Sequence, residues 1–161
     1  MGGADKTLTG LAGRFYVLGQ LAQRGLVGEM TPSTTKAVDI RVSIPDLERV
    51  CKIQVKATVK PARRLKLFGD EPFFAWPMGK KHEEITDPLL FYCFVILRGT
   101  EERPRFFVVP SADVAEYVRW EHQHWLDSRS QAVSPTSMRN FRIQISDPKG
   151  YEDDWDCLGR T

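Results

Sequence analysis

The sequence contains little cysteine, and the three cysteines present are widely spaced. Cys51, Cys93 and Cys157 are odd in number and form no CxxC pair, which excludes a disulfide framework and a zinc site of that kind. Cys51 and Cys93 lie in apolar segments, where a reduced, buried thiol is expected. Reduced thiols are typical of the cytosol, so a cytoplasmic location is predicted.

Long hydrophobic runs are absent as well. No run of about 18 apolar residues occurs, so no transmembrane helix is expected. Residues 1–8 carry charge and glycine instead of an apolar run, so no secretory signal is expected. The aromatic content, nine Phe, four Trp and four Tyr, is enough for a folded core. The length favours a single domain over 1–161, with a core at about 9–126 and a C-terminal extension at about 127–161.

Charge is distributed unevenly along the chain, although the net charge is only +2. Residues 48–81 contain nine Lys and Arg against three acidic residues, a net charge of +6, whereas residues 147–161 have a net charge of −3. A concentration of positive charge favours a polyanionic partner such as DNA. A solvated basic surface without a partner is the alternative that the sequence leaves open.

Hydrophobic spacing predicts a mixture of helices and strands. Apolar residues at three- and four-residue steps predict helices over 9–24 and 112–126, the second capped by Ser111. Alternating or continuous apolar residues predict strands at 26–30, 38–44, 51–58, 89–97, 105–109 and 141–145. Residues 59–88 are predicted to be mostly loop, with one helical turn at 80–85. The predicted fold class is therefore α/β or α+β, with a mixed central sheet flanked by helices in a single domain.

Two of these strands are predicted to form a hairpin. Residues 38–44 and 51–58 both alternate apolar and polar side chains, and a tight turn at 45–48 joins them. Matching the two apolar faces fixes the register, which pairs Val42 with Cys51, Ile40 with Ile53 and Val38 with Val55.

The polar face of this hairpin carries a candidate catalytic site. The register places Asp39 opposite Gln54, and Lys56 follows two residues later on the same face. A carboxylate oxygen and an amide oxygen can share one Mg²⁺, which takes oxygen ligands and keeps several waters. A nearby lysine can orient or deprotonate an attacking water and stabilise the charge of a phosphorane. The alternative is an ordinary solvent-facing strand surface.

The sequence around these residues also carries a family resemblance. A helix with Ala-Gly-Arg at 12–14 is followed by Ala-Val-Asp-Ile at 37–40 and Ile-Gln-Val-Lys-Ala-Thr at 53–58. This stretch resembles the core of the PD-(D/E)XK nucleases and is most similar to their Holliday-junction-resolvase-like and homing-endonuclease-like branches. The resemblance implies a restriction-endonuclease-like fold and a metal-dependent endodeoxyribonuclease that uses Mg²⁺ or Mn²⁺. It also implies metal ligation by Asp39 and Gln54 and a catalytic role for Lys56.

Two positions depart from the pattern of that family. Many relatives carry a Glu directly after a glycine of the first helix, whereas Arg14 follows Gly13 here and contributes no metal ligand. Gln54 stands where a carboxylate is more usual, which removes one negative charge. Glu29 on the first strand is a further candidate metal ligand, or else an exposed strand residue.

These departures raise an alternative function, a catalytically weak or inactive nuclease-fold module that binds DNA or serves in assembly. The orientation of Arg14 distinguishes the two hypotheses. Arg14 directed toward Asp39 favours the binding module, whereas Arg14 directed away, with Glu29 inward, favours the enzyme. A protein-interaction domain whose basic region is only solubilising is a third hypothesis.

Basic residues near the predicted site are candidate DNA contacts. A DNA strand at the site would pass close to the segment after the catalytic strand, so its phosphates would meet these side chains. The candidates are Lys60, Arg63, Arg64, Lys66, Lys80 and Lys81. Contacts of this kind are independent of base sequence. Related nucleases often dimerise to cut both strands, and the sequence leaves a homodimer open.

The predicted loop at 59–88 has two further features. His82 follows two lysines and is interpreted as a phosphate contact instead of a catalytic base. Phe73, Phe74 and Trp76 are interpreted as a hydrophobic anchor for the loop, with stacking on DNA bases as the alternative.

Overall fold

The computed structural model describes residues 5–32, 38–134 and 136–160. Within these ranges the chain forms two α-helices and seven β-strands, and short 3-10 helices lie between some of them. In chain order the helices and strands are α1 (Lys6–Gln23), β1 (Val27–Met30), β2 (Ile40–Ile44), β3 (Arg49–Thr58), β4 (Phe73–Gly79), β5 (Leu90–Ile96), β6 (Arg105–Pro110), α2 (Ser111–Asp127) and β7 (Met138–Gln144). The architecture is mixed α+β, as the sequence predicted.

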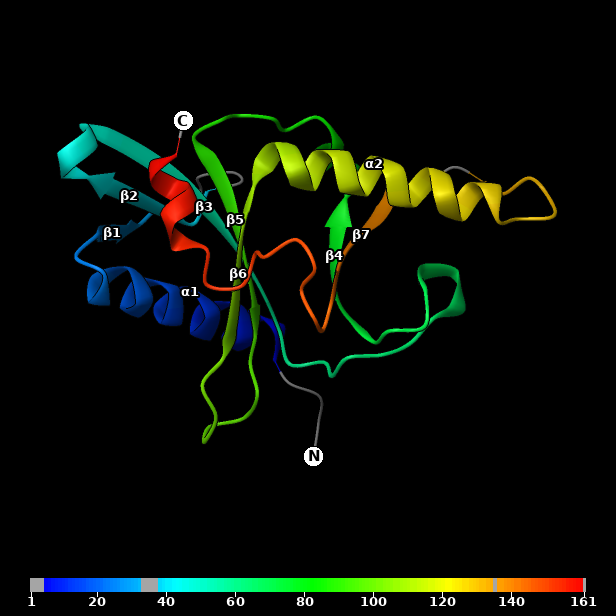
Figure 1. Cartoon of the computed structure of the whole chain (residues 1–161), viewed down its shortest axis with the longest axis horizontal. Coiled ribbons are helices and arrows are strands. Elements are labelled where there is room, and N and C mark those ends of the chain that lie inside the picture. Colours follow the sequence, from blue (N-terminus) through cyan, green and yellow to red (C-terminus); the bar gives the residue numbers. More distant parts are fainter. Residues whose placement is uncertain (1–4, 33–37, 135, 161) are drawn as a thin grey trace.

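The strands form two sheets. The main sheet has the order β1-β2-β3-β5-β6, in which β3 and β5 are parallel and the other neighbours are antiparallel. Strands β4 and β7 form a separate antiparallel pair. In Figure 1, α1 runs beside the main sheet, while α2 crosses over β4 and β7.

The predicted hairpin register is confirmed over the paired part of β2 and β3. Ile40 pairs with Ile53 and Val42 pairs with Cys51, as the matching of apolar faces required. The turn is a 3-10 helix at Pro45–Leu47, which ends at Glu48 in the left-handed conformation with φ of 46°. Both partners of each named pair are fully buried.

Strand β5 divides the core into two clusters. All seven of its residues are buried, as a continuous apolar run predicts for a strand covered on both faces. Phe91, Cys93 and Val95 pack into the cluster that α1 covers. Their neighbours Tyr92 and Phe94 pack into the cluster formed with α2, β4 and β7.

The prediction of a loop over residues 59–88 is wrong for its second half. Phe73, Phe74 and Trp76 belong to β4 and are buried, so they form core and do not present their rings to DNA bases. Pro77 obscured this strand, because proline lacks the amide hydrogen of a strand ladder. In the structure Pro77 is exposed, and β4 pairs with β7 along its whole length.

The predicted cap of α2 is also wrong. The helix begins at Ser111, after Pro110, and has no side-chain cap. The Ser111 hydroxyl instead donates a hydrogen bond to the Asp87 carbonyl, 2.6 Å away. This bond ties the start of α2 to the loop before β5.

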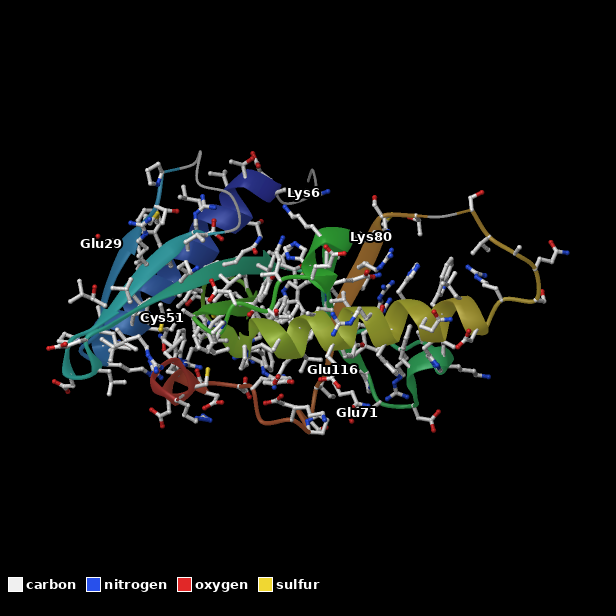
Figure 2. All side chains as sticks on the ribbon, turned by 90° about the horizontal axis from the view of Figure 1, so that it is seen from above. Lys6, Glu29, Cys51, Glu71, Lys80 and Glu116 are labelled. Carbon is white, nitrogen blue, oxygen red and sulfur yellow. The ribbon has the colours of Figure 1, made fainter. Side chains whose placement is uncertain are left out.

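The cysteines are free and buried, as predicted for Cys51 and Cys93, and Cys157 is buried as well. The Cys51 thiol lies 3.4 Å from the Leu158 carbonyl, so it contacts the C-terminal 3-10 helix (Figure 2). Neither described helix is long and apolar enough to cross a bilayer.

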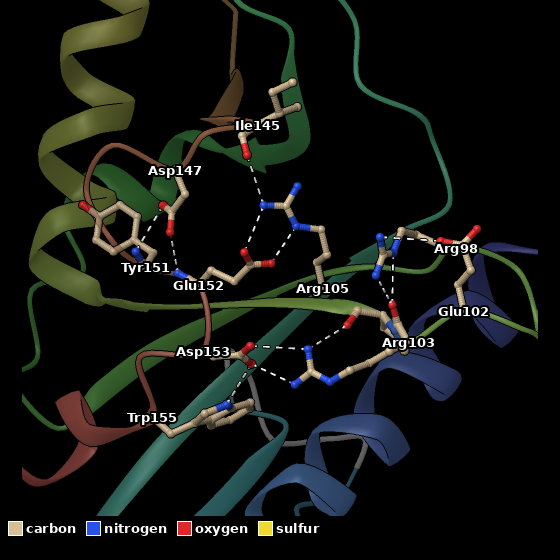
Figure 3. A network of polar contacts seen from close by, with 11 residues as sticks. Arg98, Glu102, Arg103, Arg105, Ile145, Asp147, Tyr151, Glu152, Asp153 and Trp155 are labelled. Atoms are coloured by element: carbon tan, nitrogen blue, oxygen red, sulfur yellow. Dashed lines mark hydrogen bonds and ion pairs between the residues drawn. The ribbon is translucent and has the colours of Figure 1, made fainter.

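The segment after α2 is an integral part of the fold. Phe141 and Ile143 of β7 lie in one core cluster, and Trp155 and Leu158 lie in the other. Two arginines at and just before the start of β6 form ion pairs with this segment: Arg103 pairs with Asp153 at 3.0 Å, and Arg105 pairs with Glu152 at 2.6 Å (Figure 3). The core therefore includes residues beyond 126.

Candidate functional site

Asp39 lies directly before β2 and is fixed against β3. Its amide donates to the Ile53 carbonyl over 2.9 Å, and its carboxylate Oδ2 accepts a hydrogen bond of 2.7 Å from the Val55 amide. These two bonds flank Gln54 on the same strand. The structure thus brings Asp39 beside Gln54. The Asp39 carboxylate itself points to the edge of β3, where it accepts the hydrogen bond from the Val55 amide.

Gln54 is a buried polar residue in the middle of β3. Its side chain is 9% exposed, and its Oε1 has no hydrogen-bond partner among the described residues. Leaving a buried acceptor unsatisfied costs about 1–3 kcal/mol. An unpaired carbonyl oxygen of this kind is available to a ligand that offers a positive charge or a hydrogen-bond donor.

Lys56 lies on the same face of β3, two residues beyond Gln54. Burial lowers the pKa of the Lys56 ammonium below its usual value, and the positive charge of Lys81 lowers it further. The negative charge of Asp39 acts in the opposite direction and raises it. Lys56 therefore lies in the electric field of both Asp39 and Lys81, so the three charges form one electrostatic unit.

A short 3-10 helix, Lys80–Glu83, supplies Lys81 to this unit. Glu83 forms a nearly buried ion pair with Arg139 of β7, with Nε and Oε1 2.5 Å apart. The Lys80 amide also donates to the Ser137 carbonyl over 2.9 Å. Because β7 holds the 3-10 helix in this way, the lysines are presented from a fixed backbone.

His82 lies on the same 3-10 helix, but it points inward. It is 1% exposed, and its Nδ1 lies 2.6 Å from the hydroxyl of Tyr92. Burial, followed by the positive charges of Lys56 and Lys81, lowers the pKa of His82 to about 4. The imidazole is therefore neutral at pH 7, and its burial corrects the interpretation of His82 as a phosphate contact.

Tyr92 is a residue of this site that sequence reasoning missed. It is fully buried on β5 and is the register partner of Gln54. In the sequence it is one aromatic residue in an apolar run, which predicts only a core strand. The parallel pairing of β3 with β5 is what brings it beside the predicted residue.

Arg14 extends from α1 toward the same site. Its Nη1 lies 3.9 Å from Asp39 Oδ1, and the two side chains are 32% and 27% exposed. The guanidinium therefore faces the carboxylate oxygen that Val55 does not use. This is the orientation that the binding-module hypothesis requires.

Glu29 lies on β1, the edge strand next to β2. It is exposed on β1, and its register partner on β2 is Arg41. In Figure 2, Glu29 lies toward one end of the molecule, away from Lys80. Among the described residues no group of three or more His, Cys, Asp and Glu side chains is arranged to hold a metal ion.

The predicted DNA contacts are all exposed, but the structure divides them into two groups. Lys80 and Lys81 lie on the 3-10 helix beside the site. The other four, Lys60, Arg63, Arg64 and Lys66, follow the end of β3 along a segment that runs away from the main sheet (Figure 1). Arg63 in this segment also places its guanidinium 5.7 Å from the centre of the Phe73 ring.

A groove of about 860 Å³ lies elsewhere, between α2, β7 and the segment before β4. Phe68, Trp120 and Phe141 are among its lining residues, whereas Asp39, Gln54 and Lys56 are not. Arg142 in its wall is held by an ion pair with Glu121. The groove has acidic, amide and ammonium groups of its own, in Asp113, Glu116, Asp147, Gln144 and Lys149, and these are separate from the polar residues of the hairpin.

The whole chain was compared with known proteins. No protein-family model matches it, and no curated protein matches it. Among solved structures it is similar to a bacterial homing endonuclease, I-Ssp6803I, with a TM-score of 0.59 and 13% sequence identity. The alignment covers 97% of this chain and 95% of that one. The chain has an endonuclease-like fold. At this identity the likeness shows the fold alone.

Proposed function

We propose that the chain is a metal-dependent endodeoxyribonuclease of the PD-(D/E)XK type. The observation that carries the proposal is the buried Oε1 of Gln54, which has no hydrogen-bond partner in the part of the chain that the structure describes. Gln54 lies between the two backbone positions that fix Asp39 and two residues before Lys56. An unsatisfied acceptor at this point is a cost to the fold that a bound cation removes.

The residues present fit one Mg²⁺ or Mn²⁺ ion. Asp39 and Gln54 offer a carboxylate and an amide oxygen, which are hard ligands, and Mg²⁺ commonly takes only one or two protein carboxylates, with waters and phosphates completing its shell. Such an ion, when bound, supplies Lewis acidity and a water of lowered pKa. With a single carboxylate in the set, affinity for the ion is weak until DNA phosphate contributes.

The side chains of this chain position the substrate. Lys81 is exposed beside the site and attracts phosphate, while the partly buried Lys56 places a second ammonium on the same face. His82, which is neutral and hydrogen-bonded to Tyr92, lies on the buried side of the site and adds no charge to it. The contact extends to phosphates further along the DNA through the basic residues after β3, which are Lys60, Arg63, Arg64 and Lys66.

A specific observation favours a second candidate function, the DNA-binding module with a weak or inactive site. Arg14 lies toward Asp39 and Glu29 is exposed, so a cation faces the carboxylate and Glu29 is not directed inward. In this case the same basic surface binds DNA phosphates, and Asp39 has only a structural role, through its hydrogen bond with the Val55 amide of β3.

Cleavage of supercoiled and branched DNA in Mg²⁺ or Mn²⁺ separates the two candidates. We expect wild type to nick or cut DNA, and Asp39→Ala and Lys56→Ala to lose at least about 100-fold in rate, as removal of a transition-state contact typically does. Asp46→Ala, on the exposed hairpin turn, is the matched control and should cleave as wild type does.

DNA binding in the absence of cleavage is measured separately. Salt-dependent binding without metal-dependent cutting supports the binding module, and the nuclease proposal then fails. Equal cutting by wild type, Asp39→Ala and Lys56→Ala also contradicts the proposed site, since a contaminating nuclease explains that result. Absence of any salt-dependent DNA binding overturns both candidates and favours a protein-interaction domain.

A further inference from the structure

The 3-10 helix Lys80–Glu83 brings Lys81 to the candidate site from outside the main sheet. The helix follows β4 directly, and its outer side is tied to α2 and to the chain at β7. The bonds are those from the Lys80 amide to the Ser137 carbonyl, between Glu83 and Arg139, and from Arg119 to the Glu83 carbonyl. All of them hold the helix to its own side of the fold, whereas Gln54 and Lys56 lie on the main sheet.

One hydrogen bond joins this helix to the main sheet. The Nδ1 atom of His82 lies 2.6 Å from the hydroxyl of Tyr92 on β5, and both residues are buried. Among the hydrogen bonds of the described residues, no other links the helix to a strand of the main sheet. The position of Lys81 relative to the rest of the site therefore depends on this contact.

Tyr92 is itself held in a fixed position. Its ring is stacked on that of Phe94, with 5.7 Å between the centroids, and Phe94 is stacked on Phe141 of β7 at 4.5 Å. The His82 ring meets the Tyr92 ring edge-on, with 5.5 Å between the centroids. These rings form one column that runs from the 3-10 helix through β5 to β7, so the Tyr92 hydroxyl is a rigid anchor for His82.

The contact lies at the position of Gln54 along the sheet. In the parallel pairing of β3 with β5, Tyr92 is the register partner of Gln54, and Phe94 is that of Lys56. Paired residues on neighbouring strands project from the same face of a sheet. His82 therefore packs over the face of the main sheet that carries Gln54 and Lys56. In agreement with this placement, the positive charge of Lys56 is one of the causes that lower the pKa of His82.

Stability alone does not account for a buried polar pair at this point. Exchange of both partners of a buried hydrogen bond for apolar groups of the same shape is close to neutral, so two apolar side chains would fill the space equally well. A hydrogen bond adds a defined distance and angle between the two groups. We propose that His82 and Tyr92 are positioning residues, whose hydrogen bond holds Lys81 in place over the face of β3. This inference rests on the proposed function, in which Lys81 meets a DNA phosphate at the site.

Tyr92→Phe tests the bond, because it removes the hydroxyl and retains the ring. Lys81 keeps its charge, so DNA affinity should change by less than about threefold, whereas the rate of cleavage of bound DNA should fall by at least about tenfold through loss of alignment. Single-turnover cleavage at saturating protein separates the two effects. Tyr151→Phe is the matched control: its hydroxyl also forms a hydrogen bond, to Asp113 at 3.2 Å, and its removal should leave both values unchanged.

The double variant His82→Leu, Tyr92→Phe separates positioning from folding. It leaves neither partner of the bond buried and unpaired, so its urea unfolding midpoint should be close to that of wild type. A positioning role predicts that its cleavage rate stays as low as that of Tyr92→Phe. A merely structural role predicts that the rate returns to the wild-type value together with stability, and that result overturns the proposal.

NMR titration of ¹³C-labelled lysine adds a measurement that needs no DNA. Loss of the bond frees Lys81 to move away from Lys56, so the pKa of Lys56 should rise toward its usual value in Tyr92→Phe and in the double variant, but not in Tyr151→Phe. A Lys56 midpoint that neither variant moves overturns the positioning role, whatever the chain does to DNA. A midpoint that moves in a chain without cleavage activity supports the positioning role and contradicts only the proposed nuclease.

Discussion

The guanidinium of Arg14 on α1 lies 3.9 Å from the carboxylate of Asp39 at the start of β2. Both side chains are about a third exposed, so the pair contributes little to stability, about 0–1 kcal/mol. Its greater effect is on the charge of the site, because a cation already faces the Asp39 oxygen to which Val55 does not donate.

Arg14→Glu is predicted to strengthen metal binding. The substitution replaces a repelling cation with a second carboxylate at the same helical position, so the Mn²⁺ concentration for half-saturation should fall by at least tenfold. Isothermal titration or Mn²⁺ electron paramagnetic resonance measures it without requiring activity. Arg14→Gln, which removes the cation but adds no carboxylate, should give a smaller gain. Unchanged Mn²⁺ affinity in Arg14→Glu would show that Arg14 does not face the metal position.

Lys81→Met is predicted to raise the pKa of Lys56. The charge of Lys81 is one cause of the lowered pKa, and its removal favours the protonated form of Lys56. NMR titration of ¹³C-labelled lysine follows this directly. Any activity that needs Lys56 protonated is lost as pH rises through that pKa, and this loss should move to higher pH in Lys81→Met. Lys80→Met is the control and should leave both midpoints in place; a Lys56 titration that Lys81→Met does not move contradicts the coupling.

His82 is predicted to make stability depend on pH. Its pKa in the folded chain is about 4, below the value of about 6.5 in an unfolded chain, so the unfolded state takes up more protons as pH falls. The stabilisation is therefore present above pH 6.5 and declines toward pH 4, by about 2 kcal/mol between pH 7 and pH 5. Urea unfolding at the two pH values should show a smaller difference in His82→Gln than in wild type. Equal differences would mean that His82 is not held neutral.

Gly13→Ala is predicted to destabilise the chain, because a Cβ atom at Gly13 would lie 2.6 Å from the Cβ of Ala57 on β3. Pushing α1 away from the sheet should cost about 1–3 kcal/mol, measured by urea unfolding. Gly19→Ala is the matched control: it meets no neighbour and should stabilise α1 by up to about 1 kcal/mol. Ala57→Gly should restore stability to Gly13→Ala, and failure to do so would place the strain elsewhere.

Much of the main sheet could be predicted because its signals are local. Ile40 and Ile53 alternate with polar neighbours on either side of a short turn, so one register alone buries both apolar faces. That register brought Asp39 to the stretch of β3 that contains Gln54 and Lys56. The continuous apolar run that became β5 predicted a doubly buried strand for the same kind of reason.

Of the second sheet, the strand at 141–145 was predicted and overlaps β7, whereas β4 was missed because its ladder partner is remote in sequence. Strand β4 carries Pro77, and its ladder partner β7 lies about 65 positions later in the chain, while a single bridge joins Phe73 to the nearby Arg63. The inward direction of His82 follows from this sheet, because Arg139 of β7 holds Glu83 and with it the whole 3-10 helix.

By itself the sequence determined the hairpin, its register and the presence of an acid, an amide and a lysine on one short stretch of chain. Periodicity of two and the requirement to bury apolar faces are sufficient for that. Only the tertiary structure decided what surrounds them: Arg14 against Asp39, Tyr92 beside Gln54, and His82 and Lys81 around Lys56. Burial and neighbouring charge depend on parallel pairing and helix packing across long loops, and no local pattern encodes these contacts.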